Sequence, residues 1–197
     1  MHLAMDISFT HTDGRWRTPG SWTHRTYPDP GMFEDIARIA ERGCLDMLFC
    51  GDGTGIPSTW QGSEEVAARW GIQWPRQDMS PYITLMSRAT EHLGFALTYA
   101  STFMPPFYVA RLLNSLDHLT NGRIAFNVIT STRLADAANY GFDELMDHDL
   151  RYDRMEEFID VCKALWTSVE PDAFIWDRDS GVVADPAKIH PINHVGQ

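Results

Sequence analysis

Residues 121–166, NGRIAFNVITSTRLADAANYGFDELMDHDLRYDRMEEFIDVCKALW, decide the fold: they predict a strand, a polar loop and a helix. The predicted strand, Arg123–Thr130, is apolar on both faces, which is typical of a parallel sheet covered by helices on both sides. Asn127 interrupts this run. Because a buried amide needs hydrogen-bond partners, two interpretations stay open. Asn127 bonds neighbouring backbone, or it faces a bound polar ligand.

The predicted helix has one apolar face, and continuing this face toward the helix start leads to Tyr152 and then His148. A spacing of four places these two side chains one above the other. A satisfied core histidine and a tyrosine whose hydroxyl reaches water would explain them without any function. The face itself repeats every three or four residues and consists of Met155, Phe158, Ile159, Cys162, Leu165 and Trp166.

Composition narrows the possible functions. The chain has 197 residues and a formal net charge of −11, with no run of basic residues, so neither nucleic acid nor an anionic membrane is an expected partner. No secretion signal and no apolar run of about 18 residues is seen. Cys44, Cys50 and Cys162 lie in apolar patterns, which predicts buried, reduced thiols and a cytoplasmic protein. Their spacing does not suggest a metal site.

The rest of the chain alternates predicted strands and helices. Gly43 is expected to end the first helix in the left-handed conformation, and Ser80 to cap the second. Residues 54–78 are predicted to be irregular. Strands are predicted at 3–9, 45–50, 94–100 and 123–130, and helices at 31–42, 80–90, 105–120 and 148–166.

This alternation predicts an α/β fold with a parallel sheet. No G-x-G-x-x-G motif follows the first strand, which disfavours a dinucleotide-binding fold. In a (β/α)8 barrel the carboxyl ends of the strands form the active-site face. Polar residues are found at these ends, although strands also meet polar loops for reasons unrelated to function. They are His11, Asp52, Thr98, Ser101, Asn127, Thr130 and Ser131.

Several ordered motifs together resemble the bacterial-luciferase-like flavin monooxygenases, and in particular the nitrilotriacetate, dibenzothiophene-sulfone and long-chain alkane monooxygenase group. The resemblance implies a TIM barrel that uses reduced FMN and O2 on a small organic substrate through a flavin hydroperoxide kept from water. It also implies a separate NAD(P)H:flavin reductase. The motifs are NGRIAFNVITS, the Ala-rich segment ending in NYG, HDLRYDRMEEFIDVCKALW, WRTP, ERGCLDMLFCGD, TYASTFMPPFYVARLLNSLDHLTNGR and IHPINHVGQ.

The same resemblance implies residue roles. His11 and His148 would be catalytic, since imidazole groups exchange protons near neutral pH. Thr132 stands where some relatives carry histidine, so no proton-handling role is expected there. No metal is expected. The residues that would contact FMN are Asp52, Thr98, Asn127, Ser131, Thr132 and Tyr152.

The chain is shorter than a complete barrel of this family. A complete barrel takes about 250 residues, whereas residues 1–197 contain four βα units of a single luciferase-like domain, followed by an excursion at 167–197. We therefore expect a partial barrel with exposed sheet edges, poor solubility when expressed alone, and self-association into homo-oligomers. Two alternatives remain open: a non-catalytic half-barrel remnant, and a deazaflavin-dependent oxidoreductase of the same superfamily.

Overall fold

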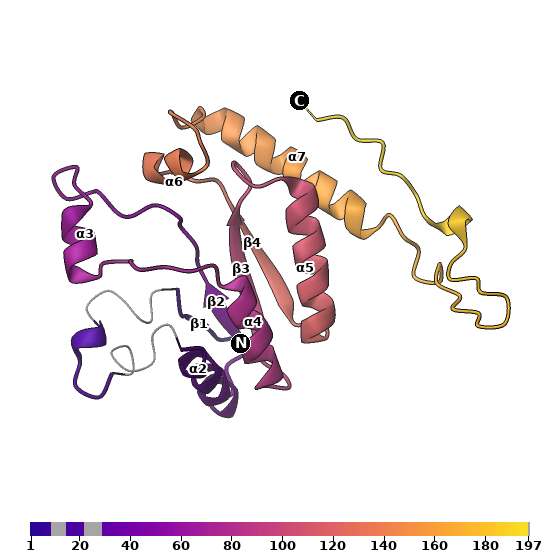
Figure 1. The fold of residues 1–197 in the computed structure, drawn as a ribbon, viewed down its shortest axis with the longest axis horizontal. Helices are drawn as coiled ribbons and strands as arrows, with labels where there is room; N and C mark the ends of the chain where they lie inside the picture. Colours follow the sequence, from indigo (N-terminus) through magenta and orange to yellow (C-terminus); the bar gives the residue numbers. More distant parts are fainter. Residues whose placement is uncertain (9–14, 22–28, 197) are drawn as a thin grey trace.

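A four-stranded parallel sheet organises the molecule, with the strands in the order β1-β2-β3-β4 (Figure 1). The structure is a computed structural model and describes residues 1–8, 15–21 and 29–196. The predicted α/β class and parallel pairing are confirmed. The first strand is shorter than predicted, and Phe9 lies outside the described residues. The bounds are β1 Ala4–Asp6, β2 Met47–Cys50, β3 Gly94–Ala100 and β4 Ile124–Ile129.

Four long helices follow the strands along the chain. Each packs on the next in the series: α2 on α4, α4 on α5, and α5 on α7. Two short helices, α3 and α6, and two 3-10 turns, η1 and η2, lie in the connections, and α3 falls in the stretch predicted to be irregular. The bounds are η1 Arg15–Arg17, α2 Gly31–Arg42, α3 Glu65–Trp70, α4 Ser80–Arg88, α5 Pro106–Thr120, α6 Leu134–Asn139, α7 His148–Trp166 and η2 Pro186–Lys188.

The apolar core lies between these helices and one face of the sheet. Leu48 on β2 and Phe95 and Leu97 on β3 belong to it, whereas the alternate residues of these strands do not. All of 123–130 is only half-buried, because β4 is an edge strand in the described structure. The prediction that helices cover both faces of this strand is therefore wrong. The second face, here called the inner face, faces away from the helix layer.

Backbone geometry corrects two predicted helix ends. Gly43 has φ −79°, and the left-handed residue is Cys44, with φ 56°. Ser80 is already helical, and Asp78 Oδ1 accepts its backbone N–H at 2.8 Å, so Asp78 takes the expected capping role. The predicted end of α5 is confirmed, since Asn121 has φ 57°.

The three cysteines are free, as predicted, but only two of them are buried. Cys50 and Cys162 lie in the core, whereas Cys44 is exposed in the turn between α2 and β2. The apolar neighbours of Cys44 in the sequence therefore misled the prediction, because Cys44 lies in the turn between α2 and β2 and its side chain is exposed there.

Two charged side chains hold the amino-terminal end of the sheet. Arg123 donates to the backbone carbonyls of Ser87, Leu93 and Thr120 at 2.9, 2.9 and 2.7 Å. Glu41 Oε1 accepts the backbone N–H groups of residues 91, 92 and 93 at 2.9, 2.6 and 3.0 Å. Contacts at this end of a barrel serve stability, because the active-site face is the opposite one.

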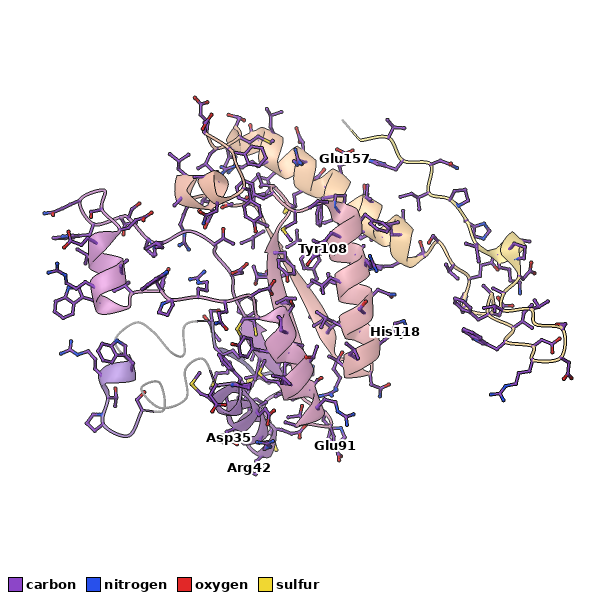
Figure 2. The ribbon with its side chains drawn as sticks, in the orientation of Figure 1. Asp35, Arg42, Glu91, Tyr108, His118 and Glu157 are labelled. Atoms are coloured by element: carbon purple, nitrogen blue, oxygen red, sulfur yellow. The ribbon has the colours of Figure 1, made fainter. Side chains whose placement is uncertain are left out.

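Residues 167–196 extend away from the sheet and return toward α7 (Figure 1). Isolated antiparallel bridges, such as Val169 with Ile189, shape this segment. Its end is held to α7 by His194, whose Nε2 lies 2.8 Å from Oε1 of Glu157, labelled in Figure 2. In the described ranges, no helix combines the length and the apolar character that crossing a membrane requires.

Candidate functional site

The carboxyl ends of β2, β3 and β4 meet around a small cavity. Its volume is about 20 Å³, enough for roughly one water molecule. Two of the predicted site residues, Asp52 and Ser131, lie in its wall. The lining residues are Asp52, Gly53, Thr54, Tyr99, Ala100, Phe103, Ile129, Ser131, Asp136 and Tyr140.

Thr98 and Asn127, two further predicted site residues, form a pair on the inner face. The parallel register places them opposite each other on β3 and β4, and Asn127 Nδ2 donates to Thr98 Oγ1 at 2.9 Å. The partner of this amide is thus a side-chain hydroxyl, so the backbone-partner interpretation is wrong. Thr98 is 2% exposed, and the pair presents polar atoms on a strand surface that is otherwise apolar.

Asp52 follows β2 directly and is largely withdrawn from water. Burial raises the pKa of its carboxyl group, and the nearby carboxylates of Asp78 and Asp136 raise the pKa further. The backbone N–H of Gly53, which donates to Asp52 Oδ1 at 2.7 Å, and the guanidinium of Arg76 oppose this shift without cancelling it. Asp52 therefore holds its proton to a higher pH than an ordinary aspartate.

Two tyrosines close the cavity from the side of β3 and α6. Tyr99 donates its hydroxyl to Asp78 at 3.0 Å, and burial is the main cause that raises the pKa of this phenol. Tyr140 stacks on Phe103 with ring centroids 5.0 Å apart. Burial, followed by the carboxylate of Asp52, raises the pKa of Tyr140 as well. Both phenols are thus neutral donors at physiological pH.

Asp136 joins the loop after β2 to the loop after β4, a role that the sequence did not reveal. Its Oδ1 accepts the backbone N–H groups of Thr54 and Gly55 at 2.9 and 2.6 Å, and its Oδ2 accepts the hydroxyl of Ser131 at 2.9 Å. A single aspartate in an Ala-rich segment matches no motif, and its partners Thr54 and Gly55 lie 82 and 81 positions earlier in the chain. Only the folded structure shows the connection.

The first turn of α7 differs from the predicted pattern. His148 and Tyr152 are neighbours, with ring centroids 5.0 Å apart, as their spacing predicts. Both are exposed, so they do not continue the core face of the helix, and neither lines the cavity. Arg151 is buried instead and donates to the carbonyl of Ser131. Its charge hid it from a search for apolar periodicity.

Thr132 follows Ser131 in the sequence but is exposed. His11 lies outside the described residues. No group of three or more His, Cys, Asp or Glu side chains that could hold a metal ion is found in the ranges 1–8, 15–21 and 29–196. The structure thus gathers Asp52, Thr98, Asn127 and Ser131 on neighbouring strands, and places His148 and Tyr152 at the start of α7.

Comparison with known proteins bears on this arrangement. A family model of luciferase-like monooxygenases matches residues 7–192. The chain belongs to the luciferase-like monooxygenase family. Dimethyl-sulfide monooxygenase from Hyphomicrobium sulfonivorans is 43% identical over 93% of this chain and 38% of its own length. Nitrilotriacetate monooxygenase component A from Aminobacter aminovorans is 40% identical over 97% of this chain and 42% of its own length.

Solved structures of proteins with a similar fold support the same family assignment. The crystal structure of a long-chain alkane monooxygenase matches with a TM-score of 0.91 at 36% identity, covering 100% of this chain and 46% of that chain. A riboflavin lyase, solved with a modified FMN, matches with a TM-score of 0.86 at 32% identity, covering 99% and 44%. This luciferase-like monooxygenase chain spans less than half the length of these relatives, and its four βα units form a partial TIM barrel.

Proposed function

We propose that this chain provides the amino-terminal half of the flavin site of an FMN- and O2-dependent monooxygenase that acts on a small organic substrate. The observation that carries the proposal is the Thr98–Asn127 pair, a hydrogen-bonded polar pair on the inner face of the parallel sheet. Membership of the luciferase-like monooxygenase family, with monooxygenase relatives at 43% and 40% identity, supports the same activity.

The side chains on this rim fit a flavin. An isoalloxazine ring offers carbonyl oxygens, ring nitrogens and an N–H group, and amide and hydroxyl groups can donate to or accept from all of these. Asn127 and Ser131 supply such groups. The cavity of about 20 Å³ is far too small for the ring. The ring is therefore expected against the inner face, in contact with Asn127, whose amide is held in place by the buried hydroxyl of Thr98.

When bound, reduced FMN supplies the electrons that activate O2. The side chains of this protein would form the environment of the flavin. Ala96, Ala100 and Ile129 share the inner face with the polar pair, as the register shows, and their apolar surface excludes water from the reacting atoms. Asp52 holds a proton near the rim because burial disfavours its charged form. His11 and His148 are proposed as further proton-handling groups, and Thr132 and Tyr152 as further flavin contacts.

The electrons are proposed to come from a separate NAD(P)H:flavin reductase. The sequence contains no dinucleotide-binding fingerprint after its first strand, so the nicotinamide cofactor would be bound by another polypeptide. The name of the Aminobacter relative, component A, points to a system of more than one polypeptide in that case. A cytoplasmic setting, where the three free cysteines remain reduced, fits this proposal.

Flavin titration tests the proposal. The purified chain is titrated with FMN, and without oxygen with reduced FMN, while flavin fluorescence is followed. We expect saturable binding, and Asn127→Ala should weaken it by roughly tenfold, the effect of one or two lost hydrogen bonds. Asn114→Ala, on the exposed face of α5, is the matched control and should bind like the wild type.

Absence of saturable binding by the wild-type chain would contradict the proposal and favour a non-catalytic half-barrel. Equal weakening by Asn114→Ala and Asn127→Ala would show that the polar pair is not the contact. A parallel titration with a deazaflavin separates the monooxygenase from the deazaflavin-dependent alternative, since tighter binding of the deazaflavin would reverse the assignment.

A further inference from the structure

We propose that Asp136 is a positioning residue: its carboxylate ties the loop after β2 to the loop after β4 and so sets the separation between the two sides of the flavin rim. This inference rests on the proposed flavin site, but the tie itself is a property of the protein without ligand. Asp136 is not placed in contact with the flavin, and it would act through Asp52 and Ser131.

The sheet alone cannot fix this separation. β2 pairs with β3, and β3 pairs with β4, so no ladder hydrogen bond joins β2 to β4. Asp136 spans β3, because Oδ1 binds the N–H groups of Thr54 and Gly55 while Oδ2 binds the hydroxyl of Ser131. One carboxylate thereby joins two loops that no ladder hydrogen bond connects directly.

The two ends of the tie lie next to predicted flavin contacts. Thr54 is two residues after Asp52, and Ser131 is itself one of the predicted contacts. Both Asp52 and Ser131 line the cavity together with Asp136. Small displacements of such groups have large effects on binding and catalysis. Fixing the distance between these loops therefore places Asp52 and Ser131 relative to each other.

Close packing reinforces the hydrogen bonds. A Cβ atom on Gly55 would lie 2.7 Å from Cβ of Ala135 and 2.9 Å from the backbone nitrogen of Asp136, so only glycine allows the loop to approach α6 this closely. Asn139, at the end of α6, donates to the carbonyl of Thr54 at 2.7 Å. Because α6 has six residues and helices this short are not stable alone, these contacts also hold the helix in place.

The partners of Asp136 also explain why a buried carboxylate is tolerated. Asp136 is 6% exposed, and burial of an unpaired charge is costly. Four hydrogen bonds satisfy its oxygens, two from backbone N–H groups and two from the hydroxyls of Thr54 and Ser131. In addition, Arg133 Nε lies 4.0 Å away. The negative charge has an electrostatic effect as well, since it raises the pKa of the neighbouring Asp52. Two different replacements of Asp136 can therefore distinguish the effect of its hydrogen bonds from the effect of its negative charge.

Two substitutions divide these roles in the full chain. Asp136→Asn keeps an acceptor for Thr54 and Gly55 and a polar group for Ser131, whereas Asp136→Ala removes all four bonds. Amide hydrogen exchange measured by NMR should show the Thr54 and Gly55 N–H groups exchanging at least tenfold faster in Asp136→Ala, with near wild-type rates in Asp136→Asn. The carboxyl of Asp52 should titrate at lower pH in Asp136→Asn, since a like charge has gone. Asp143→Asn, in an exposed loop, is the control.

Flavin affinity completes the test. Asp136→Ala should weaken FMN binding at least tenfold, and Asp136→Asn should restore most of it. Should Asp136→Ala fail to fold, Ser131→Ala removes only one arm of the tie and should give the same changes to a smaller extent. Unchanged exchange at Thr54 and Gly55 overturns the proposal, and so does faster exchange with unaltered FMN affinity. If wild-type FMN binding is absent, the proposed function fails, while the exchange and titration results still decide whether the tie exists.

Discussion

At the scale of single residues, the rim is defined by polar groups that each have a specific partner. Asn127 binds Thr98 across two strands, and Asp136 binds two loops at once. Asp52 differs, since the one hydrogen bond that its carboxyl group accepts from the described part of the chain comes from its neighbour Gly53. The charged form of Asp52 therefore has little hydrogen-bond support. Because burial raises the pKa of this group, the free energy of unfolding should change as Asp52 loses its proton.

Asp52→Asn tests this expectation. Burial raises the pKa of Asp52 in the folded state above its ordinary value of 3.8. A raised carboxyl pKa contributes stability below the unfolded-state pKa, and this contribution is lost as pH rises through the folded-state pKa. The asparagine variant should thus lose less stability than the wild type as pH rises from 4, measured by urea unfolding at several pH values. Asp117→Asn, exposed on α5, should follow the wild type.

At the scale of elements, one turn contains a backbone conformation that is unfavourable for its residue, and one helix end supplies a side chain that binds a neighbouring connection. The turn between α2 and β2 requires a left-handed residue, and the structure places Cys44 there with φ 56° although Gly43 precedes it. For residues other than glycine this conformation costs roughly 1 kcal/mol. A different connection, between α4 and β3, is supported by Glu41 at the end of α2, which accepts three backbone N–H groups there.

Cys44→Gly should therefore stabilise the chain by up to about 1 kcal/mol, since glycine adopts φ near 56° without steric cost. Urea unfolding under reducing conditions measures the change. Cys44→Ala is the control, because it removes the exposed thiol but keeps the Cβ atom. An equal gain from alanine would show that the thiol, and not the backbone conformation, is the cause.

Glu41→Gln should make stability less sensitive to acid. Burial alone would raise the pKa of Glu41, but the N–H groups of His92, Leu93 and Glu91 outweigh it and hold the pKa below its ordinary value of 4.5. A lowered carboxyl pKa contributes stability above the unfolded-state value, which is lost as pH falls through the folded-state value. At neutral pH the glutamine variant should be less stable by about 1 kcal/mol, because the side chain is half-exposed and solvent screens its charge. Glu144→Gln, which is exposed, is expected to change nothing in the same denaturation series.

At the scale of the whole molecule, the open sheet dominates behaviour. In the described ranges, no strand pairs with the outer side of β4, and its residues remain half-exposed although they are apolar. Unpaired backbone groups along an apolar edge form a template for another chain. The relatives that match over this length continue for more than as many residues again. A folded half-barrel is therefore expected to be covered by further strands or by self-association.

The chain alone should associate in a concentration-dependent way by analytical ultracentrifugation. Ala125→Lys places a charge on the inner face of β4, as the register with Ala96 shows, and should shift the equilibrium at least tenfold toward the monomer. Ala68→Lys, exposed on α3, adds the same charge away from the sheet and should not. A cooperatively melting monomer at every concentration would refute the open-edge argument.

The sequence by itself determined the alternation of four strands and four long helices, because hydrophobic periodicity and helix-ending residues are local signals. It also determined that Thr98 and Asn127 belong to the same rim, since both lie near the carboxyl ends of parallel strands. Tertiary structure alone decided that Asp136 joins two loops, that Arg151 and not Tyr152 turns inward, and that β4 is half-exposed. These features depend on contacts between residues far apart in the chain, and on which strands are present to cover an edge, and no local pattern records either.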